Sequence, residues 1–124
     1  MLVAEDTSTN QIVIRAVLRK LGFNADVVGN GEQALNALDG KEYDIVLMDI
    51  HMPVMDGITA IRKLRASRQN PNSQIPVIAL SASILKEECS QYLAAGMNDV
   101  LGKPIEIEKV QAMLEKWTSY SATK

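Results

Sequence analysis

Acidic residues stand directly after two short apolar runs of the sequence. Glu5 and Asp6 follow Leu2 to Ala4, and Asp49 follows Ile45 to Met48. Clustered carboxylates repel one another, and a hard divalent cation removes that repulsion, because carboxylate oxygens are the ligands that Mg²⁺ prefers. Taken singly, each acid is an ordinary solvated loop residue. If the two runs are neighbouring strands, the acids together predict a site for Mg²⁺ or Mn²⁺.

A lysine and a hydroxyl follow two further apolar runs. Lys103 comes after Val100 to Leu101, and Ser81 comes after Val77 to Leu80. At the same edge of a sheet, a flexible ammonium could pair with a carboxylate or a phosphoryl oxygen, and a hydroxyl could donate to that oxygen. The ordinary alternatives are a surface lysine and a serine, either Ser81 or Ser83, that caps the next helix. Pro104 is compatible with a cis peptide bond that fixes the direction of the lysine.

The elements that must position these groups follow from the hydrophobic pattern. Five runs, too short for helices and rich in Val, Ile and Leu, predict strands buried on both faces. They are Leu2 to Ala4, Ala25 to Val28, Ile45 to Met48, Val77 to Leu80 and Val100 to Leu101. Residues spaced along one helical face follow each run. These helical stripes are Val13, Val17 and Leu21 with Ile14 and Leu18 beside them; Ala34, Leu35 and Leu38; Ile58, Ile61 and Leu64; Leu85, Cys89 and Leu93; and Ile107, Val110, Leu114 and Trp117.

Strands that alternate with helices predict an α/β fold. Right-handed crossovers then give a doubly wound parallel sheet with helices on both faces. For a chain of 124 residues we expect the flavodoxin-like five-stranded order 2-1-3-4-5 with five helices. The turn after the first run carries acids instead of a phosphate-binding glycine motif, which disfavours a dinucleotide site. Ligands of such sheets bind outside the carboxyl ends of the strands, so the functional site is expected there.

Length, charge and cysteine content restrict the class of protein. We expect one domain over residues 1–119 and a tail over residues 120–124 that is cut from a longer protein. Thirteen Lys and Arg against 15 Asp and Glu give a net charge of −2, which disfavours nucleic-acid binding by this domain. The single cysteine, Cys89, cannot form an internal disulfide, and we expect it in the core. No apolar run is long enough to cross a membrane, so we expect a cytoplasmic domain without membrane contact.

Four motifs in order along the chain resemble the receiver domain, the phosphoacceptor module of two-component signalling. They are the acidic pair Glu5-Asp6, the segment Asp49 to Gly57 with the pattern D-x-x-M-P-x-M-D-G, the run Ala79-Leu80-Ser81-Ala82, and Gly102-Lys103-Pro104. The resemblance covers essentially the whole chain. It implies a phosphorylation site at Asp49, which would accept a phosphoryl group from phosphohistidine and form an aspartyl phosphate.

The resemblance also implies a role for each of the other motif residues. These roles are direct ligation of Mg²⁺ or Mn²⁺ by Asp6, Asp49 and the backbone carbonyl of His51, a metal contact through water by Glu5, and phosphoryl contact by Lys103 and by Ser81 after an inward movement. His51 and Ser83 occupy the positions that tune the lifetime of the phosphoryl group. Val100 stands where many receivers have Tyr or Phe, so the aromatic half of the usual switch is missing.

Details of the motifs are more similar to receivers attached to hybrid histidine kinases than to those of transcriptional regulators. They include Asn10-Gln11 after the acidic loop and Lys103-Pro104-Ile105 before the last helix. The implied partners are a histidine kinase core, a histidine-phosphotransfer domain, and a second copy bound through the fourth and fifth helices. Such a receiver catalyses its own phosphorylation and dephosphorylation. Within a hybrid protein it would be the cytoplasmic part of a sensor kinase.

Three other functions remain as alternatives. The first is a degenerate receiver that binds proteins without phosphorylation, although the acids and the lysine whose loss would mark it are present. The second is an aspartate-dependent phosphohydrolase of the haloacid dehalogenase type, which needs an acid where this chain has His51. The third is a flavin carrier, which would need a phosphate loop and more aromatic residues than the sequence has.

Overall fold

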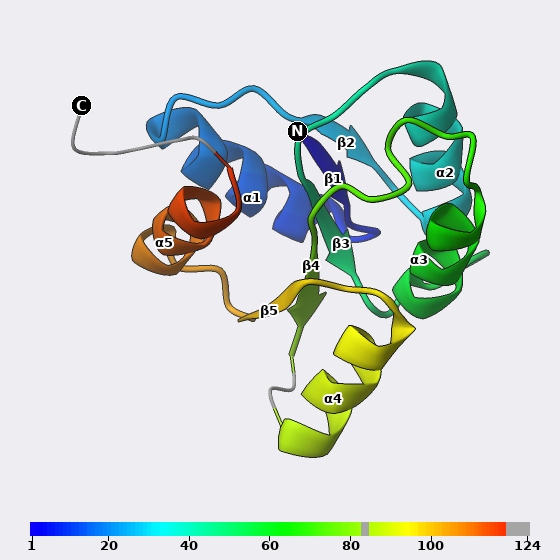
Figure 1. Ribbon diagram of the computed structural model, residues 1–124. Coiled ribbons are helices and arrows are strands. Elements are labelled where there is room, and N and C mark those ends of the chain that lie inside the picture. The colour runs from blue at the N-terminus through cyan, green and yellow to red at the C-terminus, as the bar shows by residue number, and fades with distance from the viewer. Residues whose placement is uncertain (83–84, 119–124) are drawn as a thin grey trace.

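The computed structural model describes residues 1–82 and 85–118. Strands and helices alternate along the chain as expected, and Figure 1 shows the strands in the centre with the helices around them. The elements are β1 Leu2–Ala4, α1 Ser8–Lys20, β2 Asp26–Val28, α2 Gly31–Gly40, β3 Val46–Asp49, α3 Gly57–Ala66, β4 Val77–Ser81, α4 Lys86–Ala95, β5 Asp99–Gly102 and α5 Ile107–Trp117.

The five strands form one parallel sheet in the order β2-β1-β3-β4-β5, which confirms the expected doubly wound topology. The register pairs Ala4 of β1 with Met48 of β3, and Asp49 of β3 with Leu80 of β4. The residues that follow Ala4 and Met48 therefore lie side by side at the carboxyl edge of the sheet.

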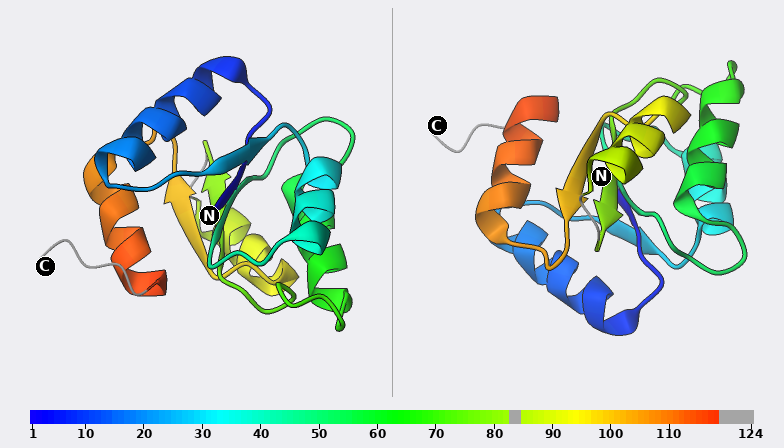
Figure 2. Two further views of the ribbon diagram at one scale, coloured as in Figure 1. Left: turned by 90° about the horizontal axis from the view of Figure 1, so that it is seen from above. Right: turned by 90° about the horizontal axis from the view of Figure 1, so that it is seen from below.

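Two layers of apolar side chains hold the helices against the sheet. On one face, α2, α3 and α4 pack on alternate strand residues such as Met48 and Ala79. On the other face, α1 and α5 pack on the intervening residues, such as Leu47 and Leu80. The two views of Figure 2 show α1 and α5 on one side of the sheet and α2 and α3 on the other. Successive strand side chains point to opposite faces, and the three central strands β1, β3 and β4 are buried on both sides. The edge strands β2 and β5 are only partly buried, which differs from the expectation for all five runs, because each has a neighbouring strand on one side alone.

The hydrophobic pattern of α4 predicts the wrong buried face. The expected buried stripe is exposed: Leu85 is 61% and Leu93 is 48% exposed, and Cys89 is half-buried. The residues of α4 that are buried are Tyr92 and Ala95. Small and apolar residues occur all around this helix, so their spacing does not identify the face that meets the sheet. Cys89 is therefore not a core residue.

Smaller corrections concern α1 and the entry to α4. The buried face of α1 is centred on Ile14 and Leu18, while Val13 is exposed. Ser81 is the last residue of β4 and does not cap α4, whose N-cap is Leu85 without a side-chain hydrogen bond. Ser83, the other expected capping residue, lies outside the described residues.

A polar network closes the amino edge of the sheet. The guanidinium of Arg65 in α3 donates to the carbonyls of Ser73, Ile75 and Gly96 at 2.8–3.1 Å. It also donates to the side-chain oxygen of Asn98 at 2.8 Å. These acceptors lie in the segments that precede β4 and β5, so one side chain ties α3 to the start of both strands.

Among the described residues, no helix is long and apolar enough to pass through a bilayer.

Candidate functional site

Three carboxylates meet at the carboxyl edge of the sheet. One ligand oxygen each from Glu5, Asp6 and Asp49 lies within 4.8 Å of the others. Glu5 and Asp49 are only 1% and 4% exposed, whereas Asp6 is exposed to solvent. The pairing of β1 with β3 brings these residues together, as the strand-end argument predicts. The donor set of clustered carboxylates with one solvent-facing member suits Mg²⁺, which keeps several waters when it binds to proteins.

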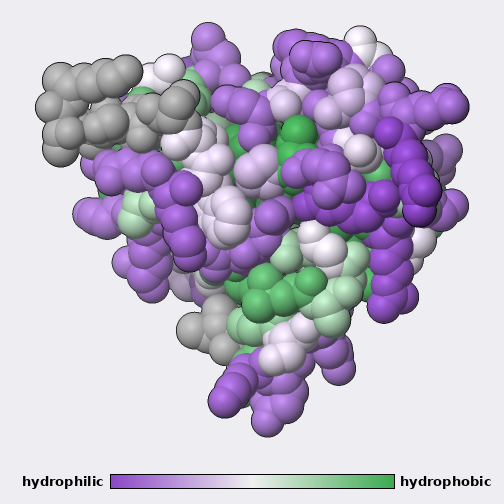
Figure 3. Space-filling model, viewed as in Figure 1, coloured by the Kyte–Doolittle hydropathy of each residue, from purple (hydrophilic) through white to green (hydrophobic). Residues whose placement is uncertain are grey.

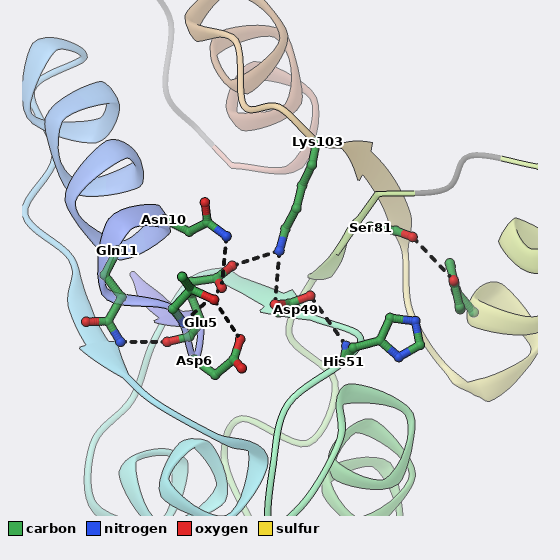
Figure 4. Close-up of polar contacts among 10 residues, drawn as sticks. Glu5, Asp6, Asn10, Gln11, Asp49, His51, Ser81 and Lys103 are labelled. Atoms are coloured by element: carbon green, nitrogen blue, oxygen red, sulfur yellow. Dashed lines mark hydrogen bonds and ion pairs between the residues drawn. The ribbon is translucent and has the colours of Figure 1, made fainter.

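Lys103 forms ion pairs with both buried acids. Its Nζ lies 3.0 Å from Oε2 of Glu5 and 3.0 Å from Oδ2 of Asp49 (Figure 4). The lysine follows β5, where its backbone N–H donates to the Ser81 carbonyl at 2.8 Å. The peptide bond between Lys103 and Pro104 is cis, as the sequence suggested. The ammonium of Lys103, which follows β5, thus contacts carboxylates from the ends of both β1 and β3.

The ionisation of these groups reflects burial and mutual contact. Burial raises the pKa of Asp49, the nearby charge of Glu5 raises it further, and Lys103 only partly opposes this rise. Burial also acts to raise the pKa of Glu5, but hydrogen bonds from Lys103 and the Thr7 N–H hold it below its usual value. For Lys103, burial acts to lower the pKa, and the bonds to Asp49 and Glu5 raise it overall. Of the two buried acids, Asp49 therefore carries the less stabilised negative charge. A bound cation would stabilise its charged form more than that of Glu5.

The residues after the acidic pair hold Glu5 in place. Its Oε1 accepts hydrogen bonds from the Thr7 N–H at 3.2 Å and from Asn10 Nδ2 at 3.4 Å. Gln11 Nε2 donates to the backbone carbonyl of Glu5 at 2.6 Å. Asn10 and Gln11 thus hold the buried Glu5 beside the exposed Asp6. Figure 4 shows Asn10 and Gln11 reaching Glu5 from α1.

The loop after β3 is shaped by close backbone contacts. His51 N–H donates to Oδ1 of Asp49 at 3.4 Å, and the His51 side chain is exposed. A Cβ on Gly57 would collide with the backbone carbonyl of Asp49, so this position requires glycine. Asp56 caps α3 by accepting from Thr59 N–H at 2.8 Å. The second half of the D-x-x-M-P-x-M-D-G segment therefore packs its backbone against that of Asp49. Its role here is to shape the loop.

Ser81 is near the site, but its hydroxyl is engaged elsewhere. Ser81 Oγ lies 3.3 Å from the hydroxyl of Tyr92, a contact that the sequence did not predict. In Figure 4 the Ser81 hydroxyl points away from Asp49 and toward α4. Strand alternation gives the reason, because Ser81 shares the α4 side of β4 with Ala79. The inward position of this hydroxyl thus remains a prediction, and Ser83 lies outside the described residues.

The fold and the site define a class of protein: a doubly wound α/β domain with an acidic cluster paired with one lysine at the carboxyl edge of its sheet. Within that class, residues 1–115 match the response regulator receiver domain. The chain belongs to this family, as the ordered motifs indicated.

Among curated proteins, the chain is similar to receivers within hybrid sensor kinases. It is 42% identical over 118 residues to the aerobic respiration control sensor protein ArcB of Escherichia coli, covering 94% of this chain and 15% of ArcB. It is 36% identical over 110 residues to hybrid signal transduction histidine kinase I of Dictyostelium discoideum, covering 85% of this chain and 6% of that protein. The chain spans 15% or less of the length of these two relatives.

Two solved structures show the same fold. The receiver domain of sensor histidine kinase PA1611 from Pseudomonas aeruginosa is 40% identical, with a TM-score of 0.86 and 96% of both chains covered. That structure has a magnesium ion coordinated in the active-site cleft. A chain from the co-crystal structure of the Saccharomyces cerevisiae histidine phosphotransfer protein Ypd1 with the Ssk1 receiver domain is 26% identical, with a TM-score of 0.85, 95% of this chain and 87% of that chain covered.

Proposed function

We propose that this chain is the phosphoacceptor of a phosphorelay and that Asp49 is the residue phosphorylated. The observation that carries the proposal is the position of the Asp49 carboxylate at the carboxyl edge of the sheet. It is paired with Lys103 and clustered with two other acids. A carboxylate nucleophile needs nearby positive charge to approach a phosphoryl group, which is itself anionic. Lys103 supplies one such charge, and the acidic cluster can hold a second.

The transfer step makes one bond and breaks one. A carboxylate oxygen of Asp49 attacks phosphorus in line with the phosphorus–nitrogen bond of a phosphohistidine, and that bond breaks with its electron pair going to the imidazole nitrogen. The leaving imidazole then takes a proton from solvent. Lys103, which contacts Oδ2 of Asp49, is positioned to follow the charge onto a phosphoryl oxygen. Bound Mg²⁺ would supply charge stabilisation to the transferring oxygens.

The residues proposed to hold the metal are those of the acidic cluster and the adjoining loop. Asp6 and Asp49 would ligate it directly, and so would the backbone carbonyl of His51. Glu5 is bound to Lys103, Thr7 and Asn10, which suits contact through a metal-bound water better than direct ligation. The magnesium ion in the PA1611 receiver supports this assignment.

We propose a histidine kinase core or a histidine-phosphotransfer domain as the phosphodonor. The surface beside the site suits a protein partner, because Ile12 and Val13 of α1 are large apolar residues exposed to solvent. Val13 also lines a recess with Asn10, Lys103 and Ile105, which continues this apolar surface to the acidic centre. The complex of Ypd1 with the Ssk1 receiver supports a partner of this kind.

The larger setting is a proposal that rests on the relatives. Because the chain spans a small part of ArcB and of the Dictyostelium kinase, we propose a receiver over residues 1–119 of a longer hybrid histidine kinase, with residues 120–124 leading onward. On this proposal the domain works on the cytoplasmic side of a sensor protein.

A second copy of the chain is proposed to bind at the groove between α4 and α5. Cys89, Leu93, Val100 and Met113 line this groove. Figure 3 shows hydrophobic surface over α4, which agrees with the exposed Leu85 and Leu93. Sedimentation velocity over a hundredfold concentration range should show a concentration-dependent dimer, and Leu93→Glu should abolish it.

The direct test of the proposed function is the intact mass of the protein after incubation with acetyl phosphate. With Mg²⁺, the wild type should gain one phosphoryl group that hydroxylamine removes, and Asp49→Asn should gain none. Asp39→Asn is the matched control, because Asp39 is an exposed acid at the C-terminal end of α2, and it should be phosphorylated normally.

Two results would replace the proposal with one of the alternatives. If the wild type forms no adduct and also fails to bind beryllofluoride, the chain is a degenerate receiver. If it releases phosphate from acetyl phosphate with rapid multiple turnover, it is a phosphohydrolase.

A further inference from the structure

A tight turn lies between Pro53 and Met55, in the loop that follows the proposed phosphoacceptor. The Met55 N–H donates to the Pro53 carbonyl at 2.7 Å, and Val54 between them has a φ of 66°. A hydrogen bond across three residues with a positive φ at the centre makes this a γ-turn of the rare and strained kind. Val54 is β-branched, and such residues disfavour the left-handed region most strongly.

The residues on either side of Val54 hold this turn in place. The Met55 carbonyl accepts from the Gly31 N–H at 2.9 Å, and a Cβ on Gly31 would lie only 2.7 Å from that carbonyl oxygen. The first residue of α2 therefore packs directly on the backbone of the loop. On the other side, the Gly57 N–H donates to the Ile50 carbonyl at 2.9 Å. A strained conformation persists where the surrounding structure determines it in this way.

Packing within the domain does not account for a valine at this position. The Val54 side chain is 77% exposed, more than any other large hydrophobic residue in the described part of the chain. Within residues 1–82 and 85–118, it is also the only residue other than glycine with a positive φ. Asparagine or glycine adopts this backbone conformation at a lower cost. The apolar side chain thus serves neither the turn nor the core, which indicates a contact outside the domain.

Val54 lies close to Asp49. The backbone of Gly57 touches that of Asp49, since a Cβ on Gly57 would overlap the Asp49 carbonyl oxygen. Val54 precedes Gly57 by three residues, and consecutive Cα atoms are about 3.8 Å apart, so its Cα lies within about 11 Å of the Gly57 Cα. Figure 4 shows His51 of the same loop beside Asp49. A protein that brings a phosphohistidine to Asp49 therefore also reaches the surface on which Val54 is exposed.

We propose that Val54 is a specificity-determining contact residue, whose side chain packs on an apolar surface beside the phosphohistidine of a histidine-phosphotransfer domain. The inference rests on the proposed function, because it requires such a donor for Asp49. It adds a residue that the motif leaves open, since Val54 occupies the last x of the pattern D-x-x-M-P-x-M-D-G.

The contact at Val54 would complement the apolar residues of α1. Ile12 and Val13 are exposed on α1, which packs on one face of the sheet, whereas Val54 belongs to the connection that leads to α3 on the other face. Apolar contacts on both sides of the acidic centre would orient the donor, and in-line attack on phosphorus depends on orientation. Because the turn is already held by its neighbours, docking on Val54 would not have to order a flexible segment.

The test compares a protein phosphodonor with a small one. The protein is phosphorylated Ypd1, the histidine phosphotransfer protein of Saccharomyces cerevisiae. The small donor is phosphoramidate, which has the phosphorus–nitrogen bond of a phosphohistidine but no protein surface. Intact mass after timed quenching gives the rate at which the 124-residue chain gains a phosphoryl group in the presence of Mg²⁺.

Three variants separate the apolar contact from the shape of the loop. Val54→Asn tolerates the left-handed turn and removes the apolar side chain. Val54→Ile keeps a branched apolar side chain at the same place. Ala66→Asn is the matched control, because Ala66 is an exposed apolar residue at the end of α3 that lies farthest along the helix from Asp49.

Val54→Asn should distinguish the two donors. Its second-order rate constant with phosphorylated Ypd1 should fall about five- to tenfold, the size expected when most of a valine side chain is no longer buried at an interface. Its rate with phosphoramidate should be unchanged. Val54→Ile and Ala66→Asn should match the wild type with both donors.

The inference is disproved, with Asp49 still the acceptor, by any of three results. The first is transfer from Ypd1 to Val54→Asn at the wild-type rate; if this variant then also fails to self-associate in sedimentation velocity, Val54 contacts a second copy instead. The second is an equal slowing with both donors, which marks a structural role for the turn. The third is a wild type that accepts from phosphoramidate but not from Ypd1. If the wild type gains no phosphoryl group from either donor, the proposed function is overturned, and the inference is overturned with it.

Discussion

Lys103 is the side chain on which the charge balance of the site depends. It is bonded to both Glu5 and Asp49, which are almost wholly buried. Two buried carboxylates without a cation would repel each other and lack solvation. The lysine therefore stabilises the fold as well as serving the proposed chemistry.

Replacing Lys103 with Met should destabilise the protein by about 2–4 kcal/mol at pH 7, the size expected when one partner of a buried ion pair is removed. In the folded protein the pKa of Asp49 is above its ordinary value, so protonation of Asp49 favours the folded state. The loss should shrink as the pH falls through that raised pKa, and Mg²⁺ should restore part of it at pH 7. Urea unfolding at pH 7 and pH 5, with and without Mg²⁺, measures the loss in free energy of unfolding.

Lys109→Met is the control, because Lys109 forms an exposed ion pair with Glu106. Equal losses for Lys103→Met at both pH values would contradict the argument.

Tyr43 should ionise about two pH units later than an ordinary tyrosine. Burial and the hydrogen bond to Asp26 raise the pKa of Tyr43 to about 12. The difference between the ultraviolet pH titrations of the wild type and Tyr43→Phe isolates this residue. A midpoint near the ordinary value of 10.0 in that difference would show that the bond to Asp26 does not persist in solution.

The sequence identified the charged residues of the site but missed Tyr92 and Arg65. The acids and Lys103 could be found because they lie at or just after the ends of strands, and parallel strands bring their carboxyl ends together. Tyr92 lies inside a helix, and Arg65 binds backbone carbonyls from segments remote in sequence. Every residue has a backbone carbonyl, so no sequence motif identifies the residues whose carbonyls accept from Arg65.

Among the elements, α4 departs most from what its sequence indicates. The strand runs and the buried faces of α2, α3 and α5 could be recognised because their apolar residues fall on one side. In α4, Tyr92 and Ala95 face inward while Leu85 and Leu93 face outward. The helix has apolar residues on both sides, so only its contacts with the sheet decide which side is buried.

The loop between β3 and α3 contains one strained residue. Val54 has a φ of 66° and is exposed, although β-branched residues strongly disfavour this left-handed region. Asn tolerates the region better, so Val54→Asn should stabilise the protein by about 0.5–1 kcal/mol. Chemical denaturation measures the gain. Val54→Thr keeps the branched side chain and should show no gain, and equal stabilities of the two variants would refute the explanation.

On the scale of the whole molecule, the two edges of the sheet have different tasks. The carboxyl edge holds the acidic cluster with its mutual repulsion. The amino edge holds Arg65, which is bonded to four residues of two different connections. The Arg65 network thus stabilises the domain at a distance from the site that must bind and release a ligand.

Arg65→Lys should therefore unfold the whole domain more easily. A lysine keeps the charge but cannot reproduce the planar set of donors, and a loss of about 2–4 kcal/mol follows from the hydrogen bonds left unmade. Urea unfolding followed by circular dichroism gives the value. Arg62→Lys on the exposed side of α3 should change stability little, and a similar effect of both substitutions would show that the network is unimportant.

The separation of the two edges has an evolutionary consequence. A substitution of the exposed His51 side chain at the acidic edge leaves the contacts of Arg65 untouched. Duplicated copies of this domain can thus diverge at exposed positions beside the acidic cluster without loss of the Arg65 network that supports folding.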